Sequence, residues 1–557
     1  TPGHPERGET PGVEITTGPL GQGFANAIGM AMAEKMLAAQ FNEEGTTIVD
    51  HRTWAFCGEG DMMEGVTSEA ASLAGRLHLG LDKLTVFFDS NHVTLDGAAD
   101  VEFSENVAER FRAYGWHVAT VDNVNELGQI DRAIEEAKAE TTRPSLVVVH
   151  SHIGYGSPVQ DTAKAHGSPL GEENVAKTRE TLNWPYAPFE VPDAVYDRWR
   201  TQVAERASTH AAWQETFERY GADHPAQAAE FSRVMAGQLP ADWRDATPVF
   251  ETGTKVATRV SGGKALNAFG IKIPEFVGGA ADVLSSTHTA IDGSGNLNAG
   301  EWSGRNIFFG IREHAMGSIC NGMAAHGGFR PFCSTFFSFK DYMVEPVRLA
   351  ALMGLPVVFV FTHDSIGLGE DGPTHQPVEH LASLRAMPGL RVFRPADANE
   401  SAQAWAAAIA FEGPSAIILS RQGLPTLDSA VLNVGAGASI VAAGDEAVLL
   451  STGSEVSLAL EARDLLADRG IAARVVSMPS MEIFREQSDA DRDKILPPDP
   501  PILAIEAASP LGWHEFADDV LGLTRFGASA PGPTVYRELG FTAEAIADRV
   551  AKLLGKG

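Results

Sequence analysis

The chain has 557 residues, and 43 Lys and Arg against 73 Asp and Glu give it a formal net charge of −30 at pH 7. A surface of that sign repels polyanions, which argues against nucleic-acid binding as the main function and leaves room only for local basic pockets. A composition with 44% hydrophobic and 21% charged residues is typical of a packed globular protein, and the length allows about three to five domains. Three scattered cysteines form no CxxC pair, so they support neither a disulfide framework nor a zinc ribbon.

The predicted elements alternate between helices and β-rich runs, which indicates layered α/β units. Residues 24–41 have helical spacing and are rich in Ala and Met, and the small residues among them suit close packing against a sheet. Three short β-branched runs, at 84–89, 145–150 and 356–362, predict buried parallel strands.

The domain organisation follows from the places where this alternation breaks. Residues 186–250 combine Pro, Trp and charged positions with helical stretches, as expected of a long connection on the surface. A second α/β unit covers about 250–430, and a third opens near 433 with a strand–Gly–helix pattern. We therefore divide the chain into residues 1–235, which include most of the connection, 236–432 and 433–557.

The first candidate site is the segment AFCGEGDMMEG at 55–65, followed by FFDSNHVTLDG at 87–97. An apolar strand runs into Gly58, Glu59 and Gly60, where glycines let backbone N–H groups approach a phosphate. Glu59 and Asn91 could both offer oxygen ligands to a Mg²⁺ ion that bridges phosphates. A GxG pattern alone is more often a tight turn, and the acidic residue and the strand-end Asn favour the functional interpretation.

The second candidate site is the loop THDSIGLGEDGPTHQP at 362–377. It follows a predicted strand, and open α/β sheets bind ligands at the carboxyl ends of their strands. His363 and His375 taken singly are equally well explained as polar groups of an ordinary loop. Their combination with several acids and glycines favours a binding site.

This loop resembles the signature of the transketolase family, and the resemblance extends through TPGHPE, TTGPLGQG, the GxG…N metal motif, GIREHAMG and STFFSFKDY. It therefore covers essentially the whole chain. The resemblance implies three doubly wound α/β domains: a diphosphate-binding, a pyrimidine-binding and a C-terminal domain. It also implies a homodimer that uses thiamine diphosphate, with active sites at the subunit interface.

The resemblance assigns cofactor contacts to residues in several motifs. Glu313 matches the glutamate that hydrogen-bonds N1′ of the aminopyrimidine, although without the resemblance a capping or salt-bridged Glu beside Arg312 would be the simpler interpretation. An aromatic pocket for that ring is implied, although aromatic residues at spacing three are more often helix core. The implied cofactor-binding residues are Gly18, Leu20, Gly58, Gly60, Asn91, His166, Asp282, Glu313, Phe336, Phe339 and Tyr342.

Substrate contacts are implied in the same way. His4 and His375 resemble the pair near the C1 hydroxyl and C2 carbonyl of the donor ketose, and His166 resembles a histidine that transfers a proton near the reacting centre. Asp371 resembles the carboxylate that reads a substrate hydroxyl. The group implied to hold the terminal phosphate has suitable donors, and a plain surface Arg remains the simpler view of one of its arginines, Arg259. Its members are Arg259, Ser286, His363 and Arg421.

The metal motif departs from the family pattern. The implied ligands are Glu59, Asn91 and Val93, but the family usually has Gly-Asp-Gly where this chain has Gly-Glu-Gly. Because Mg²⁺ demands near-ideal octahedral geometry, the longer side chain predicts weaker Mg²⁺ binding or a preference for Ca²⁺ or Mn²⁺. The neighbouring Asp61 could compensate.

Two further expectations concern carboxylates and length. Glu64 and Glu69 match residues that run between the two active sites of the family's dimer, so we expect them to share protons. The family also carries a segment before TPGHPE that the given sequence lacks. Three explanations are open: the sequence as given omits the segment, another polypeptide supplies it, or this is a naturally short member of the family. If nothing replaces it, an apolar patch should be exposed near the diphosphate site.

The resulting functional prediction is transfer of a two-carbon ketol unit from xylulose 5-phosphate to ribose 5-phosphate or erythrose 4-phosphate, in the pentose phosphate pathway of the cytoplasm. The alternatives are a dihydroxyacetone synthase, with formaldehyde as acceptor, and a non-catalytic subunit that pairs with a full-length partner. Deoxyxylulose-phosphate synthase fits the signature loop less well. No membrane or nucleic-acid partner is expected, and no apolar run reaches 18 residues.

Overall fold

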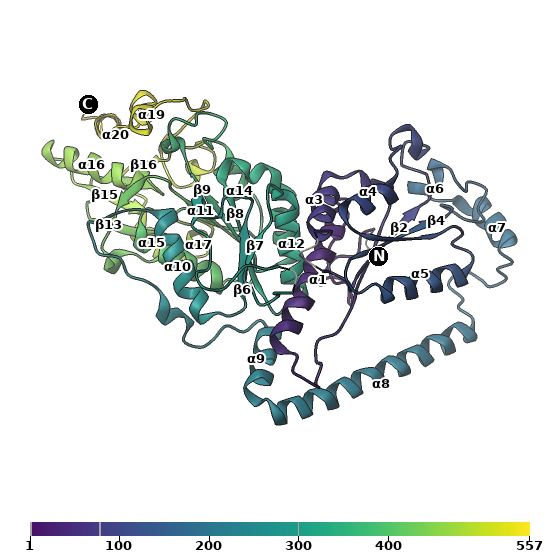
Figure 1. The fold of residues 1–557 in the computed structure, drawn as a ribbon. Helices are drawn as coiled ribbons and strands as arrows, with labels where there is room; N and C mark the ends of the chain where they lie inside the picture. Colours follow the sequence, from purple (N-terminus) through teal and green to yellow (C-terminus); the bar gives the residue numbers. More distant parts are fainter. Residues whose placement is uncertain (1–2, 77–79, 299, 557) are drawn as a thin grey trace.

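A computed structural model describes residues 3–76, 80–298 and 300–556. In chain order, this part folds into a four-stranded, a six-stranded and a five-stranded sheet, with helices packed on them (Figure 1). A two-stranded ribbon, β12 (Gly423–Pro425) with β5 (Lys255–Ala257), joins residues at the two ends of the middle unit.

The first sheet is parallel throughout, in the order β1-β2-β4-β3. Strands β2 and β4 are mostly buried, which confirms the predicted strands at 84–89 and 145–150. The elements of this unit are α1 (Gln22–Phe41), β1 (Thr53–Cys57), α2 (Glu59–Met63), α3 (Gly65–Ala74), β2 (Leu84–Ser90), α4 (Val107–Tyr114), β3 (His117–Val121), α5 (Leu127–Ala139), β4 (Ser145–His150), α6 (Ala163–Gly167) and α7 (Gly171–Thr181).

A long exposed helix, α8 (Asp193–Asp223), leads from the first unit to α9 (Pro225–Met235) and runs along the edge of the molecule (Figure 1). This confirms the predicted surface connection with helical stretches. The helix is polar over most of its length, and no helix of the described ranges combines the length and apolar character needed to cross a membrane.

The second sheet is also parallel, in the order β10-β11-β9-β8-β6-β7, and β9 confirms the predicted strand at 356–362. The elements of this unit are β5 (Lys255–Ala257), α10 (Thr258–Lys272), β6 (Phe276–Ala280), α11 (Leu284–Thr287), β7 (Asn306–Phe308), α12 (Glu313–His326), β8 (Arg330–Phe336), the 3₁₀ helix η3 (Phe337–Met343), α13 (Val344–Met353), β9 (Val358–Thr362), the 3₁₀ turn η4 (Ile366–Leu368), α14 (His380–Arg385), β10 (Arg391–Phe393), α15 (Ala398–Ala410), β11 (Ser415–Leu419) and β12 (Gly423–Pro425).

The third sheet has the order β13-β15-β14-β16-β17, and only β13 runs antiparallel to its neighbour. The predicted strand–Gly–helix opening is present as β14, Gly453 and α16, and one further strand, β13, precedes it. The elements are β13 (Ser439–Ala442), β14 (Ala447–Ser451), α16 (Glu455–Asp468), β15 (Ala473–Ser477), α17 (Met481–Arg485), α18 (Asp489–Ile495), β16 (Ile502–Ile505), β17 (Asp519–Leu521), α19 (Gly532–Glu538) and α20 (Ala543–Leu553).

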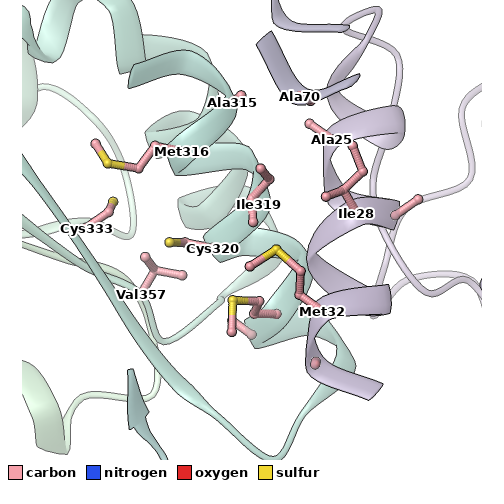
Figure 2. Packing of buried hydrophobic residues seen from close by; sticks show 14 of the residues in the cluster. Ala25, Ile28, Met32, Ala70, Ala315, Met316, Ile319, Cys320, Cys333 and Val357 are labelled. Carbon is pink, nitrogen blue, oxygen red and sulfur yellow. The ribbon is translucent and has the colours of Figure 1, made fainter. Parts of the chain in front are cut away.

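Helices α1 and α12 join the first two units. Figure 2 shows Ile28 and Met32 of α1 facing Ile319 of α12 across a buried apolar seam. A methyl group added to Gly322 of α12 would fall 2.7 Å from the carbonyl carbon of Asn26 in α1, so glycine allows this approach. The small residues of α1 therefore make their closest approach to a helix of the next unit, and not to a sheet as predicted.

Candidate functional site

Gly58 joins the carboxyl end of β1 to α2, and Glu59 and Gly60 are the first two residues of that helix. Asp61 fixes this strand-to-helix turn, because its two carboxylate oxygens accept hydrogen bonds from the backbone N–H groups of Gly58 at 2.9 Å and Gly21 at 2.7 Å. Both carboxylate oxygens of Asp61 therefore already accept a backbone hydrogen bond. The idea that Asp61 compensates for the unusual Glu59 as a metal ligand finds no support in this geometry.

The loop that carries Gly18 and Leu20 packs on the same turn. A Cβ on Gly60 would fall 2.7 Å from Cδ1 of Leu20, so the leucine occupies the space above the glycine. A Cβ on Gly18 would lie 3.5 Å from the His4 ring. The structure thus brings four predicted residues, His4, Gly18, Leu20 and Gly60, to one place beside β1.

Glu59 is buried and meets the segment that holds the other two predicted metal ligands. Its Oε1 accepts the backbone N–H of His92 at 2.7 Å, and the Asn91 Oδ1 accepts the backbone N–H of Val93 at 3.1 Å. Burial raises the pKa of Glu59, the His92 N–H opposes this, and the nearby Asp89 carboxylate adds to it. Oxygen donors and unbalanced negative charge suit a hard divalent cation, so the residues present fit such an ion.

An apolar groove of about 780 Å³ opens beside the same turn. Phe56 is 80% exposed although it lies on a strand, and Phe56 and Trp54 both stack on Phe87. An exposed apolar patch therefore lies beside the turn that the sequence predicts to bind the diphosphate. The lining residues are Trp54, Phe56, Cys57, Gly58, Asp61, Phe87, Asp89, Val124, Ile130, Ile134 and Val149.

Glu313 is the first residue of α12 and lies at the junction of the first two units. Burial raises the pKa of its carboxyl group, and a hydrogen bond from Thr335 opposes this shift. Glu69 of α3 accepts the backbone N–H of Ala315 at 3.0 Å. Burial raises the pKa of Glu69 as well, with the Glu313 charge adding to the effect, so the two carboxyl groups interact.

Aromatic residues continue from the end of β8 into η3. The ring centroids of Phe336 and Phe339 lie 6.3 Å apart, as do those of Phe339 and Tyr342. His363 packs on Phe336 at 3.9 Å, and His375 meets the edge of Phe339 at 5.2 Å. Both signature-loop histidines therefore contact the predicted aromatic pocket.

A cationic group surrounds His363. The Arg259 Nη1 donates to the Ser286 carbonyl at 2.6 Å, whereas its Nε is buried and has no partner among the described residues. Burial, followed by the charges of Arg259, Arg421 and His375, lowers the pKa of His363 to about 3. Burial and then Arg421 lower the pKa of Arg259. Donors with unbalanced positive charge suit a phosphate.

The sequence interpretation missed His288, which belongs to this group. Its backbone is left-handed, with φ 55°, and burial followed by the Arg259 charge lowers its pKa. Its position two residues after the predicted Ser286 was the available signal. Asp89, beside the predicted metal ligands, was missed for a different reason, because a carboxylate at the end of a strand is common.

Seven predicted polar residues are exposed, and their side chains form no hydrogen bond within the described ranges: His4, Glu64, His166, Asp282, Tyr342, Asp371 and Arg421. Glu64 does not meet Glu313 within this chain as Glu69 does. More broadly, no hydrogen bond, ion pair or aromatic contact of the described residues joins the group around Glu59 to the group around His363. Helices α1, α3 and α12 lie between the first and the second sheet (Figure 1).

The two groups fall within the ranges of two different family models. The family model "Transketolase, thiamine diphosphate binding domain" matches residues 1–240, "Transketolase, pyrimidine binding domain" matches 254–426, and "Transketolase-like TK C-terminal domain" matches 437–542. The chain belongs to the transketolase family. It is an enzyme, a transferase that moves ketol groups with thiamine diphosphate, and the comparisons do not favour a dihydroxyacetone synthase or a non-catalytic subunit.

Curated transketolases match over the full chain. The chain is 50% identical to the transketolase of Geobacillus stearothermophilus and covers 85% of that protein, with 100% of its own length aligned. It is 46% identical to chloroplastic transketolase-1 of Arabidopsis thaliana, with 98% of this chain and 76% of that protein covered.

Solved transketolases have the same fold. The structure from Leishmania mexicana superposes with a TM-score of 0.96 at 42% identity and covers 100% of this chain and 83% of its own. A Pichia stipitis transketolase in complex with sedoheptulose-7-phosphate gives 0.96 at 40% identity, covering 100% and 84%. The three α/β units predicted from the sequence are thus confirmed.

Proposed function

We propose that this chain transfers a two-carbon ketol unit from xylulose 5-phosphate to ribose 5-phosphate or erythrose 4-phosphate, as a step of the pentose phosphate pathway. The observation that carries the choice of phosphorylated sugars is the pair of cationic side chains, Arg259 and Arg421, beside His363 at the carboxyl end of the second sheet. Related structures from Pichia stipitis contain xylulose-5-phosphate and sedoheptulose-7-phosphate, which supports sugar phosphates as ligands.

The phosphate end of the sugar would bind between Arg259 and Arg421, with Ser286 and His363 completing the group. His363 is neutral at pH 7, because its pKa lies near 3, so it can donate one ring N–H without adding to the positive charge. Two guanidinium groups give bidentate recognition that a phosphate-free sugar cannot use.

Thiamine diphosphate, when bound, supplies the nucleophilic carbon and the electron sink for breaking and forming the carbon–carbon bond. The residues proposed for its aminopyrimidine are Phe336, Phe339, Tyr342 and Glu313, with Asp282 near the thiazolium. The raised pKa of Glu313 suits a carboxyl group that shares a proton with ring nitrogen N1′. The diphosphate would lie at Gly58 and Gly60, near Gly18, Leu20 and His166.

A divalent cation would bind at Glu59, Asn91 and the backbone carbonyl of Val93. Glu59 uses one carboxylate oxygen for the His92 N–H, which leaves the other for the metal. Because the longer side chain alters the distance to the ion, we propose that Ca²⁺ or Mn²⁺ competes better with Mg²⁺ here than at a Gly-Asp-Gly turn.

The reacting end of the sugar would meet His4 and His375. We propose that these histidines hydrogen-bond the C1 hydroxyl and the C2 carbonyl oxygen, where negative charge develops. His166 would move a proton near the same centre, and Asp371 would read a substrate hydroxyl. Thr374 holds the His375 ring through a 2.9 Å contact between Oγ1 and Nδ1, so the ring enters the site oriented.

We further propose a homodimer in which each active site combines the Glu59 group of one subunit with the His363 group of its partner. Support comes from the lack of contact between the two groups in one chain and from exposed apolar side chains near Glu313, among them Phe308, Ile311 and Tyr342. Glu64 and Glu69 would then share protons with Glu313 between the sites. The division at 235/236 and 432/433 stays a proposal.

The deciding experiment is ketol transfer from xylulose 5-phosphate to ribose 5-phosphate, with thiamine diphosphate and each divalent ion in turn. Glu313→Ala should abolish transfer. Arg421→Ala should raise KM for xylulose 5-phosphate about tenfold or more, because a hydrogen bond to a charged group contributes about 1.5–3 kcal/mol. The KM for unphosphorylated xylulose should be unaffected, and Arg463→Ala, which changes a partly exposed arginine of α16, is the matched control. Equal losses with both donors would contradict the phosphate assignment.

A further inference from the structure

A buried charged network lies directly behind the substrate loop. Asp364, the residue after His363, accepts hydrogen bonds on one carboxylate oxygen from Arg394 Nη2 at 2.7 Å and Nε at 3.1 Å. Both side chains are almost fully buried, with 2% and 1% of their surface exposed. A buried carboxylate of this kind persists only when it is paired, so Arg394 fixes the position of Asp364.

The third unit of the chain completes this network. Arg394 also pairs with Glu455 at the start of α16, and its Nη1 lies 3.5 Å from a carboxylate oxygen of Glu506, the residue after β16. The Tyr536 hydroxyl of α19 donates to Glu455, and Arg385 of the second unit forms two hydrogen bonds with Glu506. The guanidinium that fixes the substrate loop is therefore itself held mainly by the C-terminal unit.

The backbone of the loop is clamped by the same unit. Gln376 donates from Nε2 both to Gly369 within the loop at 2.8 Å and to the carbonyl of Ala528 at 3.0 Å. A Cβ on Gly369 would fall 2.9 Å from the backbone nitrogen of Gly532, at the start of α19. The backbone of the loop therefore contacts the backbone of α19 directly, and no side chain fits at Gly369.

The conformation of His363 explains why this support matters. Its φ is 64°, in the left-handed region that non-glycine residues rarely adopt, and its ring is buried against Phe336. Such backbone persists when the surroundings hold it in place. The nearest restraint on the C-terminal side of His363 is the Asp364–Arg394 pair.

We propose that the C-terminal unit is a positioning device for phosphate recognition: Tyr536 and Glu455 hold Arg394, Arg394 holds Asp364, and Asp364 holds His363 toward the sugar phosphate. None of these four supporting residues needs to touch the substrate. The inference rests on the proposed phosphate-binding role of His363 and gives the C-terminal unit a function in specificity.

The test compares Glu455→Gln and Tyr536→Phe with Asp519→Asn. Asp519 also pairs with an arginine of the C-terminal unit, Arg549, but contacts neither the network nor the loop. For each variant in the thiamine-diphosphate-loaded enzyme, kcat and KM are measured with xylulose 5-phosphate and with xylulose. We expect the kcat/KM ratio of phosphorylated to unphosphorylated donor to fall about tenfold in Glu455→Gln, through KM, because sub-ångström misplacement has costs of this order. The ratio should fall less in Tyr536→Phe and stay constant in Asp519→Asn.

The outcomes separate the two proposals. A fall in the ratio for Arg421→Ala without one for Glu455→Gln or Tyr536→Phe would overturn the positioning role and leave the phosphate site intact. No fall in any of the three would overturn the phosphate site. Equal losses with both donors would show a merely structural network and also overturn the inference. If Glu455→Gln does not fold, Tyr536→Phe decides, since it removes one hydroxyl only.

Discussion

The contact between α1 and α12 makes a sharp prediction about Gly322. In a Gly322→Ala variant the new methyl group would fall 2.7 Å from the carbonyl carbon of Asn26 and closer still to the oxygen, both backbone atoms that a side-chain rotation cannot move. The two helices must separate by about 1 Å to restore an ordinary contact distance.

That separation has a calculable energetic cost. Overpacking of a tight seam costs about 1–3 kcal/mol. A 1 Å shift of α12 also breaks the 3.0 Å hydrogen bond from the Ala315 N–H to the Glu69 carboxylate, which contributes about 1.5–3 kcal/mol. The variant should therefore lose about 2.5–6 kcal/mol of stability. Because Glu313 begins α12, kcat should fall as well.

The assay is calorimetric unfolding together with steady-state ketol transfer. Gly65→Ala is the matched control, since Gly65 also lies in a helix and a methyl group there meets nothing within 4 Å. We expect a lower Tm and lower kcat for Gly322→Ala, and a native-like or slightly higher Tm for Gly65→Ala. Equal Tm and kcat in the two variants would refute the conclusion that glycine sets the distance between these helices.

Three more predictions follow from single side chains. Glu59→Asp should tighten Mg²⁺ binding about fivefold relative to Ca²⁺, because the shorter carboxylate restores the usual turn; titration calorimetry with each ion measures this, and an unchanged ratio would contradict it. Burial, with Asp397 adding, raises the pKa of Glu400 from 4.5 to about 8. The folded state then holds a proton that the unfolded state lacks between these values, so stability falls as pH rises through this window. Glu400→Gln should remove that slope in melts across the same range, and parallel slopes in both proteins would contradict the assignment. Phe56→Ser should lower the binding of a hydrophobic dye to the apolar groove by about half or more, because Phe56 is the most exposed large hydrophobic side chain that lines it. Unchanged fluorescence would show that the dye binds elsewhere.

The sequence predicted the parts of the fold that depend on local pattern. Continuous β-branched runs identified β2, β4 and β9, because strands buried on both faces need apolar residues at every position. The packing partner of α1 could not be predicted in this way. Small residues signal a close approach but not what approaches, and here the partner is α12, almost 300 residues away.

The candidate site shows the same limit. Motif resemblance identified His363 and Arg259, and the structure places them in one cationic group. The direction of the Asp61 carboxylate could not be read from its place beside Glu59, because it depends on the N–H of Gly21, which a different loop supplies. The partners of Arg394 come from a different unit, and no spacing in the sequence joins them.

Helix α12 links the packing of the first two units to the chemistry of the candidate site. Its first residue is Glu313, the Ala315 N–H in its first turn donates to the Glu69 carboxylate, and its Gly322 sets the distance to α1 of the first unit. The proton affinity of Glu313 and of Glu69 is therefore set by how two units of one chain pack, since burial at their junction raises both pKa values. In the proposed dimer, the first unit binds the diphosphate for one active site while shaping the acid of the other. A change in packing between α1 and α12 would then alter proton transfer without touching either ligand.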